Sequence, residues 1–279
     1  MISALQKIEK ELPIKGAAMI KLVASDIDGT LLRDGNTEIS KEVFEHIRRL
    51  KESGVLFVAA SGRQYTSIRR LFAPVADDIV YLCENGAILY QDGQVLGKLP
   101  MDRAGAEKLI GQILAHEDME VLISGADTSY MMPKSQDYLD HIRYFVGNNI
   151  TLVESAEEIS EDILKVSAYC RSGAAVYDKP FGDIWRGMFR VAVSGEKWLD
   201  ITEADKGRGL TQMCRTLGIS LSETAVFGDN FNDLAMLEKA GYPWIIRNSV
   251  LDRAGYGGKA GICVTDRVEA VLAKLLERV

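Results

Sequence analysis

The chain has 279 residues, of which 47% are hydrophobic, and carries a formal net charge of −7 at neutral pH. This length and composition predict a large buried core divided between two domains. The acidic charge argues against nucleic acid or an anionic membrane as the main partner, and no apolar run approaches the ~20 residues of a membrane span. The N-terminus lacks the continuous apolar segment of a signal peptide, and the scattered cysteines favour reduced thiols and a cytoplasmic location.

The first 18 residues precede the first strand-like segment and have a pattern of their own. Apolar residues recur at helical spacing, and Pro13 ends the pattern; they are Ile2, Leu5, Ile8 and Leu12. This stretch is either a helix that docks elsewhere or the product of an upstream start, and the pattern does not separate the two.

Two aspartates follow the first predicted strand. The apolar residues Ile20, Leu22 and Val23 lead into Asp-Ile-Asp-Gly-Thr at positions 26–30. One interpretation is an Asp-Gly turn whose side chains bond only to local amides. However, Asp26 continues a buried strand, where a carboxylate is costly unless a cation or hydrogen-bond donors meet it. Because open α/β folds build their sites at the carboxyl ends of strands, we expect these acids to be functional.

The next predicted strand ends in groups suited to a phosphate oxygen. A helix is predicted over 40–53 from its apolar spacing, and the β-branched and aromatic run at 55–60 predicts a buried strand. This strand ends at Ser61, Gly62 and Arg63, which supply a hydroxyl group and free backbone amides.

Residues 90–198 interrupt this alternation with a pattern of their own. A hairpin signal at Asp92-Gly93 opens the segment, which at about a hundred residues is too long for a plain connection. Helices are predicted over 103–116, 136–145 and 174–186, and strands over 121–123, 129–132, 166–170 and 189–193. The segment is therefore predicted to be a small α/β domain with an open sheet, inserted into a core formed by residues 19–89 and 199–279.

After the insertion, Lys206 opens a predicted helix with an apolar stripe. Its charge opposes the helix macrodipole and therefore needs an anionic partner. A short strand at 225–227 then ends in Gly-Asp-Asn-Phe-Asn-Asp at 228–233, followed by predicted helices at 234–240 and 268–276. We expect this second acidic loop to face the first.

Four motifs in this order resemble those of the haloacid dehalogenase superfamily. They are Asp-Ile-Asp-Gly-Thr at 26–30, Ser-Gly-Arg at 61–63, Lys-Gly at 206–207 and Gly-Asp-Asn-Phe-Asn-Asp at 228–233. Glu-Asn-Gly-Ala at 84–87 and the large insertion between the second and third motifs resemble the Cof-type phosphatases. The resemblance covers nearly the whole chain from Met19 onward. It implies an α/β fold with a Rossmann-like parallel-sheet core, an inserted α/β cap domain, a magnesium ion and an aspartyl-phosphate intermediate.

The resemblance also assigns roles to the motif residues. It implies that Asp26 is the nucleophile and Asp28 the general acid/base. The protein ligands of Mg²⁺ would be Asp26, the backbone carbonyl of Asp28, and Asp229, since hard oxygen ligands suit this ion. Lys206 would hold a phosphate oxygen in the transition state, and Asp233 would orient Lys206 or a metal-bound water. The expected substrate-binding residues are Ser61, Gly62, Arg63, Asn85 and Asn232.

Two positions depart from the family pattern. Arg247 stands where many relatives have a small residue, and Glu84 precedes Asn85 where relatives often have a small or neutral one. Arg247 either contacts a second acidic group of the substrate or is a solvated loop residue, which we favour because arginines are mostly exposed. Both departures bear on specificity and leave the four catalytic motifs intact.

These observations predict a magnesium-dependent phosphatase of small phosphorylated metabolites, such as sugar phosphates or phosphorylated cofactors. We expect a monomer or weak homodimer that binds neither nucleic acid nor a membrane. The alternatives are a phosphomutase of the same fold and a non-catalytic phosphometabolite-binding protein, although binding alone needs no second acid beside Asp26. Specificity is expected from cap loops near Asp127 and Lys134, which would close over the site about hinges near Leu89 and Leu199.

Overall fold

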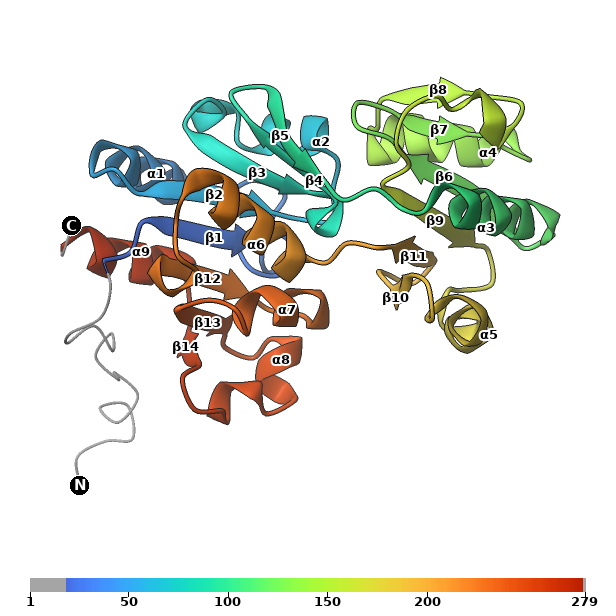
Figure 1. Cartoon of the computed structure of the whole chain (residues 1–279). Helices are drawn as coiled ribbons and strands as arrows, with labels where there is room; N and C mark the ends of the chain where they lie inside the picture. The colour runs from blue at the N-terminus through green and yellow to red at the C-terminus, as the bar shows by residue number, and fades with distance from the viewer. Residues whose placement is uncertain (1–18, 278–279) are drawn as a thin grey trace.

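The computed structural model describes residues 19–277, which form two α/β domains joined by two chain crossings (Figure 1). Within these residues, the core domain contains an eight-stranded sheet with the order β14-β13-β12-β1-β2-β3-β4-β5. Neighbouring strands from β14 to β3 are parallel, and β4 and β5 add an antiparallel hairpin. The strands are β1 (Leu22–Asp26), β2 (Leu56–Ala60), β3 (Ile79–Cys83), β4 (Ile88–Gln91), β5 (Gln94–Lys98), β12 (Thr224–Gly228), β13 (Tyr242–Ile246) and β14 (Cys263–Thr265).

Helices cover both faces of the core sheet. One face packs against α1 (Lys41–Glu52), α2 (Tyr65–Leu71) and α9 (Val268–Leu276). The other packs against α6 (Lys206–Leu217), α7 (Leu234–Leu237) and α8 (Val250–Arg253). Because both faces are covered, the central strands are continuous apolar runs, and all five residues of β1 are buried.

Local sequence explains where the predicted helices begin. The Ser40 hydroxyl accepts a hydrogen bond from the amide of Val43 and caps α1, whose buried stripe includes Ile47 and Leu50. Asp205 caps α6 in the same way, by accepting from the amide of Arg208.

The cap domain is a second sheet, which in the described part of the chain has six strands in the order β10-β11-β9-β6-β7-β8. All neighbours are antiparallel except β7 and β8. Helices α3 (Arg103–Ala115) and α5 (Ala175–Trp185) pack on one face of it. The strands are β6 (Met119–Ser124), β7 (Ser129–Met131), β8 (Ile150–Leu152), β9 (Lys165–Cys170), β10 (Arg190–Val193) and β11 (Trp198–Thr202).

The predicted α/β core with an inserted α/β domain is confirmed, but the predicted domain boundaries differ from the sheet topology. Leu89 lies inside β4 of the core sheet, and Leu199 lies inside β11 of the cap sheet. The chain therefore crosses at 99–102, between β5 and α3, and at 203–205, between β11 and α6. Local patterns identify a hairpin or a strand, but they do not show which sheet it joins, because that depends on pairing with distant strands.

Several cap elements also differ in detail from the sequence predictions. The helix predicted over 136–145 is α4 (Gln136–Asp140) followed by a π-helical turn, His141–Val146. Strands β8 and β11 were not predicted; β8 has only three residues, too few for a periodic signal. The predicted N-terminal helix lies outside the described residues. No helix within residues 19–277 has the length and apolarity needed to cross a membrane.

Candidate active site

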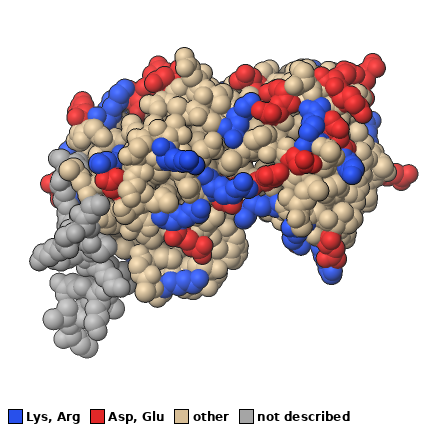
Figure 2. Space-filling model, in the orientation of Figure 1, with Lys and Arg blue, Asp and Glu red and all other residues tan. Residues whose placement is uncertain are grey.

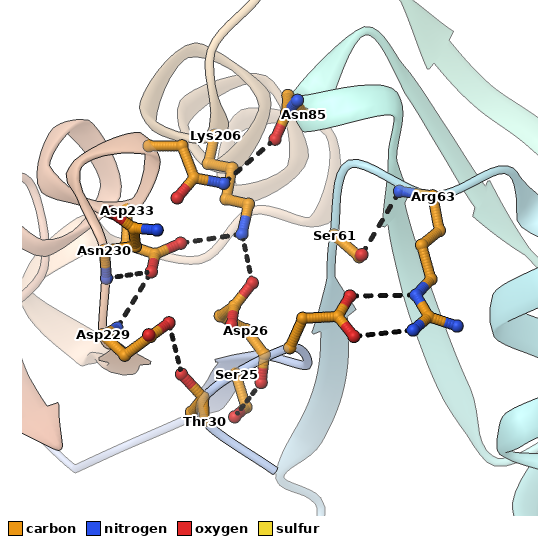
Figure 3. A network of polar contacts seen from close by, with 12 residues as sticks. Ser25, Asp26, Thr30, Ser61, Arg63, Asn85, Lys206, Asp229, Asn230 and Asp233 are labelled. Carbon is orange, nitrogen blue, oxygen red and sulfur yellow. Dashed lines mark hydrogen bonds and ion pairs between the residues drawn. The ribbon is translucent and has the colours of Figure 1, made fainter. Parts of the chain in front are cut away.

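The sequence motifs meet at the carboxyl edge of three adjacent parallel strands. Asp26 is the last residue of β1 and lies beside Ala60 at the end of β2. Ser61 follows β2, and Asp229 follows β12 on the other side of β1. Lys206 begins α6 and points into the same space (Figure 3). Segments nearly 200 residues apart in sequence thus contribute to one cluster of polar side chains.

Lys206 is the cation at the centre of this cluster. Its side chain is fully buried, and its ammonium group donates to Asp26 Oδ1 at 2.5 Å and to Asp233 Oδ1 at 2.7 Å (Figure 3). Burial alone would lower the pKa of Lys206, but the two carboxylates outweigh it and raise the pKa. Lys206, which was expected to need an anionic partner at this helix start, therefore has two, Asp26 and Asp233.

Asp233 anchors the second acidic loop to Lys206. Its second oxygen, Oδ2, accepts from the backbone amides of Asp229 at 2.9 Å and Asn230 at 3.1 Å. Three donors thus satisfy this buried carboxylate, and Lys206 is one of them. The short helical turn Phe231–Asp233 makes this possible because it brings the side chain back to the start of its own loop.

The carboxylates of Asp26 and Asp229 accept fewer hydrogen bonds than that of Asp233. Asp26 is 4% exposed, and its Oδ2 has no hydrogen-bond partner among the described residues. The Thr30 hydroxyl donates to Asp229 Oδ1 at 3.3 Å. Asp229 can approach closely only because Gly29 has no side chain: a Cβ there would lie 2.3 Å from Asp229 Oδ2.

The three carboxylates of Asp26, Asp229 and Asp233 each place an oxygen within 4.8 Å of the other two. Burial raises the pKa of Asp26 well above its usual value, and Asp233 raises it further, against the opposing effect of Lys206. Burial and Asp233 likewise raise the pKa of Asp229 to about 6. One ammonium group does not balance three carboxylates, so a further cation would stabilise the cluster.

Asp28 lies in a different environment from Asp26. Its side chain is 53% exposed, and Arg63 donates to both of its oxygens, from Nε to Oδ2 at 2.9 Å and from Nη2 to Oδ1 at 2.6 Å. Arg63 was predicted to bind substrate, but the structure directs its guanidinium group to Asp28. This two-bond geometry fixes the direction of the Asp28 carboxylate.

The remaining predicted site residues surround the turn after β2. Ser61 is buried, and its hydroxyl accepts from the backbone amide of Arg63 at 3.2 Å. The Asn85 side chain lies against Gly62, where a Cβ would be 3.0 Å from Asn85 Nδ2. Asn232 donates to Asn85 Oδ1 at 3.3 Å. The structure therefore brings all four motifs and the 84–87 segment together.

A family model described as haloacid dehalogenase-like hydrolase matches residues 23–252, which span this site and the whole cap. The chain belongs to this family. The identification made from the four motifs is thereby confirmed.

The similarity between this haloacid dehalogenase-like hydrolase and its named relatives extends over most of both chains. It is 27% identical over 266 residues to the Escherichia coli 5-amino-6-(5-phospho-D-ribitylamino)uracil phosphatase YbjI, covering 89% of this chain and 96% of the relative. It is 26% identical over 244 residues to the E. coli pyridoxal phosphate phosphatase YbhA, covering 79% and 85%. A crystal structure from Eubacterium rectale has a TM-score of 0.80 and 26% identity, covering 94% of this chain and all of that one.

Sequence reasoning missed the cap residue that reaches this site in the hydrolase. Lys165, the first residue of β9, lies 2.5 Å from Glu84 Oε2 and donates to the backbone carbonyl of Gly62 at 3.3 Å. A lone lysine before an apolar strand gives no local signal of such a contact. Thr30 was also missed, although its place directly after the Asp-Gly turn is the signal that could have identified it.

The specificity candidates also make contacts within the chain. The Lys134 ammonium donates to the carbonyls of His116 and Met119 at 2.7 Å each, and so stabilises the junction between α3 and β6. The Arg247 side chain is 32% exposed and lies in a surface ion pair, in which its Nε donates to Asp266 Oδ1 at 2.6 Å. The carbonyl of Asp127 accepts from Asn149, within the cap.

Proposed function

We propose that this protein is a magnesium-dependent phosphatase of small phosphorylated metabolites that works through an aspartyl-phosphate intermediate on Asp26. The observation that carries the proposal is the state of the Asp26 carboxylate. Lys206 holds one of its oxygens, while the other is buried without a hydrogen-bond partner in the described chain. A buried, unpartnered oxygen is costly in a protein that only folds, and it is useful where a ligand completes the site.

The carboxylate cluster fits a magnesium ion. Asp26 and Asp229 offer hard oxygen atoms, and the unpartnered Asp26 oxygen needs a positive neighbour. Asp233 already accepts three hydrogen bonds, so the proposed ligands are Asp26, Asp229 and the backbone carbonyl of Asp28, with Asp233 supporting them. When bound, Mg²⁺ offsets the repulsion between the attacking carboxylate and the phosphate group.

In the proposed reaction, an oxygen of Asp26 attacks phosphorus and the bond from phosphorus to the ester oxygen breaks. Asp28 donates its proton to the departing alcohol. Asp28 then takes a proton from water, which attacks the aspartyl phosphate, so that inorganic phosphate leaves and Asp26 is regenerated. Arg63 donates to both oxygens of Asp28 and so orients this carboxyl group, and each oxygen keeps a second lone pair for the transferred proton.

The proposed phosphate contacts are the Ser61 hydroxyl, the Gly62 amide, Lys206 and Asn232, which lie around Asp26. Donors placed before the reaction stabilise the charge that develops on the phosphoryl oxygens. The net charge of the chain is −7, so an anionic substrate needs local positive charge. On the face drawn in Figure 2, several Lys and Arg side chains gather where the two domains adjoin.

The substrate class follows from the division between core and cap. The core groups contact only phosphate and metal, so discrimination between esters is assigned to the cap. The named relatives act on a phosphorylated ribitylaminouracil and on pyridoxal phosphate, which supports small phosphorylated metabolites, including phosphorylated cofactors and sugar phosphates. A phosphomutase would need to protect the aspartyl phosphate from water, whereas the exposed Asp28 is open to it.

A phosphate-release screen over a panel of phosphorylated metabolites tests this proposal. The wild type should release phosphate from at least one class of ester with Mg²⁺ and none after EDTA treatment. Asp26→Asn should release none under either condition, because an amide does not attack phosphorus. Phosphate release by a purified, folded Asp26→Asn protein at the wild-type rate would refute the assignment of the nucleophile.

A further inference from the structure

A buried ion pair connects the cap to the core beside the proposed phosphate-binding turn. Lys165 is on cap strand β9 and is 7% exposed; Glu84 follows core strand β3 and is 3% exposed. Their charged groups are 2.5 Å apart. Lys165 also donates to the carbonyl of Gly62, whose amide is a proposed phosphate contact, at 3.3 Å. Part of the core turn is therefore held by a side chain from the other domain.

Lys165 has a second carboxylate partner, within its own domain. Asp200 of β11 lies 3.7 Å from its ammonium group and accepts a hydrogen bond from Ser167 at 2.6 Å. Burial alone would lower the pKa of Lys165, but Asp200 and Glu84 outweigh it and raise the pKa, so the side chain stays charged. If the cap moves away from the core, Lys165 keeps Asp200 and loses Glu84 and the Gly62 carbonyl.

Glu84 begins a backbone turn that needs outside support. Glu84, Asn85 and Gly86 have φ angles of 50°, 55° and 96°, so two residues with side chains are in the left-handed region. That conformation is strained for a residue with a side chain. The Glu84 amide donates to the carbonyl of Arg63, and the Asn85 amide to that of Ser61. The strained turn is thus joined to the 61–63 turn on one side and to Lys165 on the other.

We propose that Lys165 is a positioning residue that, through Glu84 and the Gly62 carbonyl, sets the phosphate-binding turn only when the cap is closed. This inference rests on the proposed phosphatase function. In the closed protein the Lys165 charge holds the Glu84 side chain and one carbonyl of the 61–63 turn. Opening returns Glu84 to water and removes this support from Asn85 and Gly62. The contacts of Lys165 with Glu84 and the Gly62 carbonyl therefore link cap position to phosphate affinity, and they do not involve the leaving group.

The test measures kcat and KM for p-nitrophenyl phosphate and competitive inhibition by inorganic phosphate, both with Mg²⁺. Lys165→Met should weaken phosphate inhibition and lower kcat/KM by at least tenfold, because it leaves the Glu84 charge unpaired. Glu84→Gln should have an effect in the same direction. Since both substitutions break the same ion pair, the double variant should lose no more phosphate affinity than the more impaired of the two single variants.

Lys98→Met is the matched control. Lys98 of core strand β5 forms an ion pair with Asp162 of the cap, and both side chains are partly exposed. This variant also removes a lysine that connects the domains, and it should keep phosphate inhibition within twofold of the wild type.

Two results would overturn the inference: unchanged phosphate inhibition in Lys165→Met, or single-variant effects that multiply in the double variant. A loss of thermal stability without a change in inhibition would show a structural role only, and would also overturn it. If Lys165→Met fails to fold, the Lys165→Met/Glu84→Met pair also removes the buried Glu84 charge, and it should show the same weakened inhibition. A wild type that turns over no ester would refute the proposed function, whereas failure of this inference alone leaves wild-type turnover intact.

Discussion

Replacing Asp26 with asparagine is expected to abolish turnover and yet leave the metal-free protein at least as stable as the wild type. Asparagine has nearly the same size and shape, so packing at the end of β1 is preserved. The substitution removes one charge from a buried cluster in which Lys206 is the ammonium group that contacts the carboxylates. The effect on stability therefore depends on the balance of charges around position 26.

That balance follows from the distances. Asp26 places an oxygen within 4.8 Å of both Asp229 and Asp233. With an effective dielectric constant of ~20, each neighbour repels a charge on Asp26 by at least ~3.5 kcal/mol, so the two together contribute ~7 kcal/mol. Lys206, at 2.5 Å from Oδ1, contributes ~7 kcal/mol of attraction on the same scale. These effects cancel, and the penalty for burying a charge decides the sign. Removal of the charge should raise the free energy of unfolding by ~1 kcal/mol or more.

Magnesium should reverse the order of stability of the wild type and Asp26→Asn. An ion that binds only the folded protein stabilises it by ~2.7 kcal/mol at a hundred times its dissociation constant. Asp26→Asn removes one proposed ligand, so the variant should gain less from the ion than the wild type does. The wild type should then be the more stable protein in Mg²⁺ and the less stable one in EDTA.

Denaturant unfolding of both proteins in EDTA and in Mg²⁺ measures this crossover. Asp28→Asn is the control, because its carboxylate is exposed and forms an ion pair with Arg63. An exposed pair contributes ~0–1 kcal/mol, so the metal-free stability of this control should change little. Metal-free Asp26→Asn that is less stable than the wild type by more than ~2 kcal/mol would show that Lys206 dominates the cluster and would refute the reasoning.

Three further predictions concern the same cluster. Lys206→Met should lower the free energy of unfolding by ~3–5 kcal/mol, because it leaves buried carboxylates unpaired, and should lower kcat by ~10²–10³; wild-type kinetics would exclude Lys206 from the reaction. Calcium should restore little activity to EDTA-treated enzyme, because a larger ion takes more oxygen ligands and loosens the alignment that Mg²⁺ gives; equal rates with the two ions would contradict this. In EDTA, the unfolding free energy of the wild type should fall relative to that of Asp229→Asn as the pH rises from about 4 to about 6. The reason is that the folded protein keeps the Asp229 proton up to a pKa of about 6, whereas the unfolded chain releases it near 3.8. Parallel pH profiles for these two proteins would refute the raised pKa.

The core of the site could be predicted from sequence because each motif is short and follows its own strand. An apolar run such as 55–60 predicts a buried strand, and the parallel topology then places the residues that follow each strand at the carboxyl edge of the sheet. The physical requirement for a partner identified Lys206 before its contacts were known. In such motifs, one local pattern carries both the position and the chemistry.

Contacts between the domains could not be predicted in this way. Lys165 and Glu84 are 81 positions apart, and neither belongs to a pattern that names the other. The predicted domain boundaries near Leu89 and Leu199 differ from the sheet topology for the same reason, since strand pairing decides which sheet a segment joins. The partner of Arg247 could not be predicted either, because the average exposure of arginines says nothing about Asp266, with which this one forms a surface ion pair.

The environments of Asp26 and Asp28 support the division of roles between them. A nucleophile that carries a phosphoryl group needs a fixed position and protection from bulk water, and Asp26 is 4% exposed and held by Lys206. A general acid/base must exchange protons with solvent in every turnover, and the Asp28 side chain is 53% exposed. Two carboxylates separated by one residue thus lie in opposite surroundings, because β1 ends at Asp26 and the chain turns at Gly29, where φ is 89°. When the environments of two acids differ this much, they are suited to different steps of one reaction.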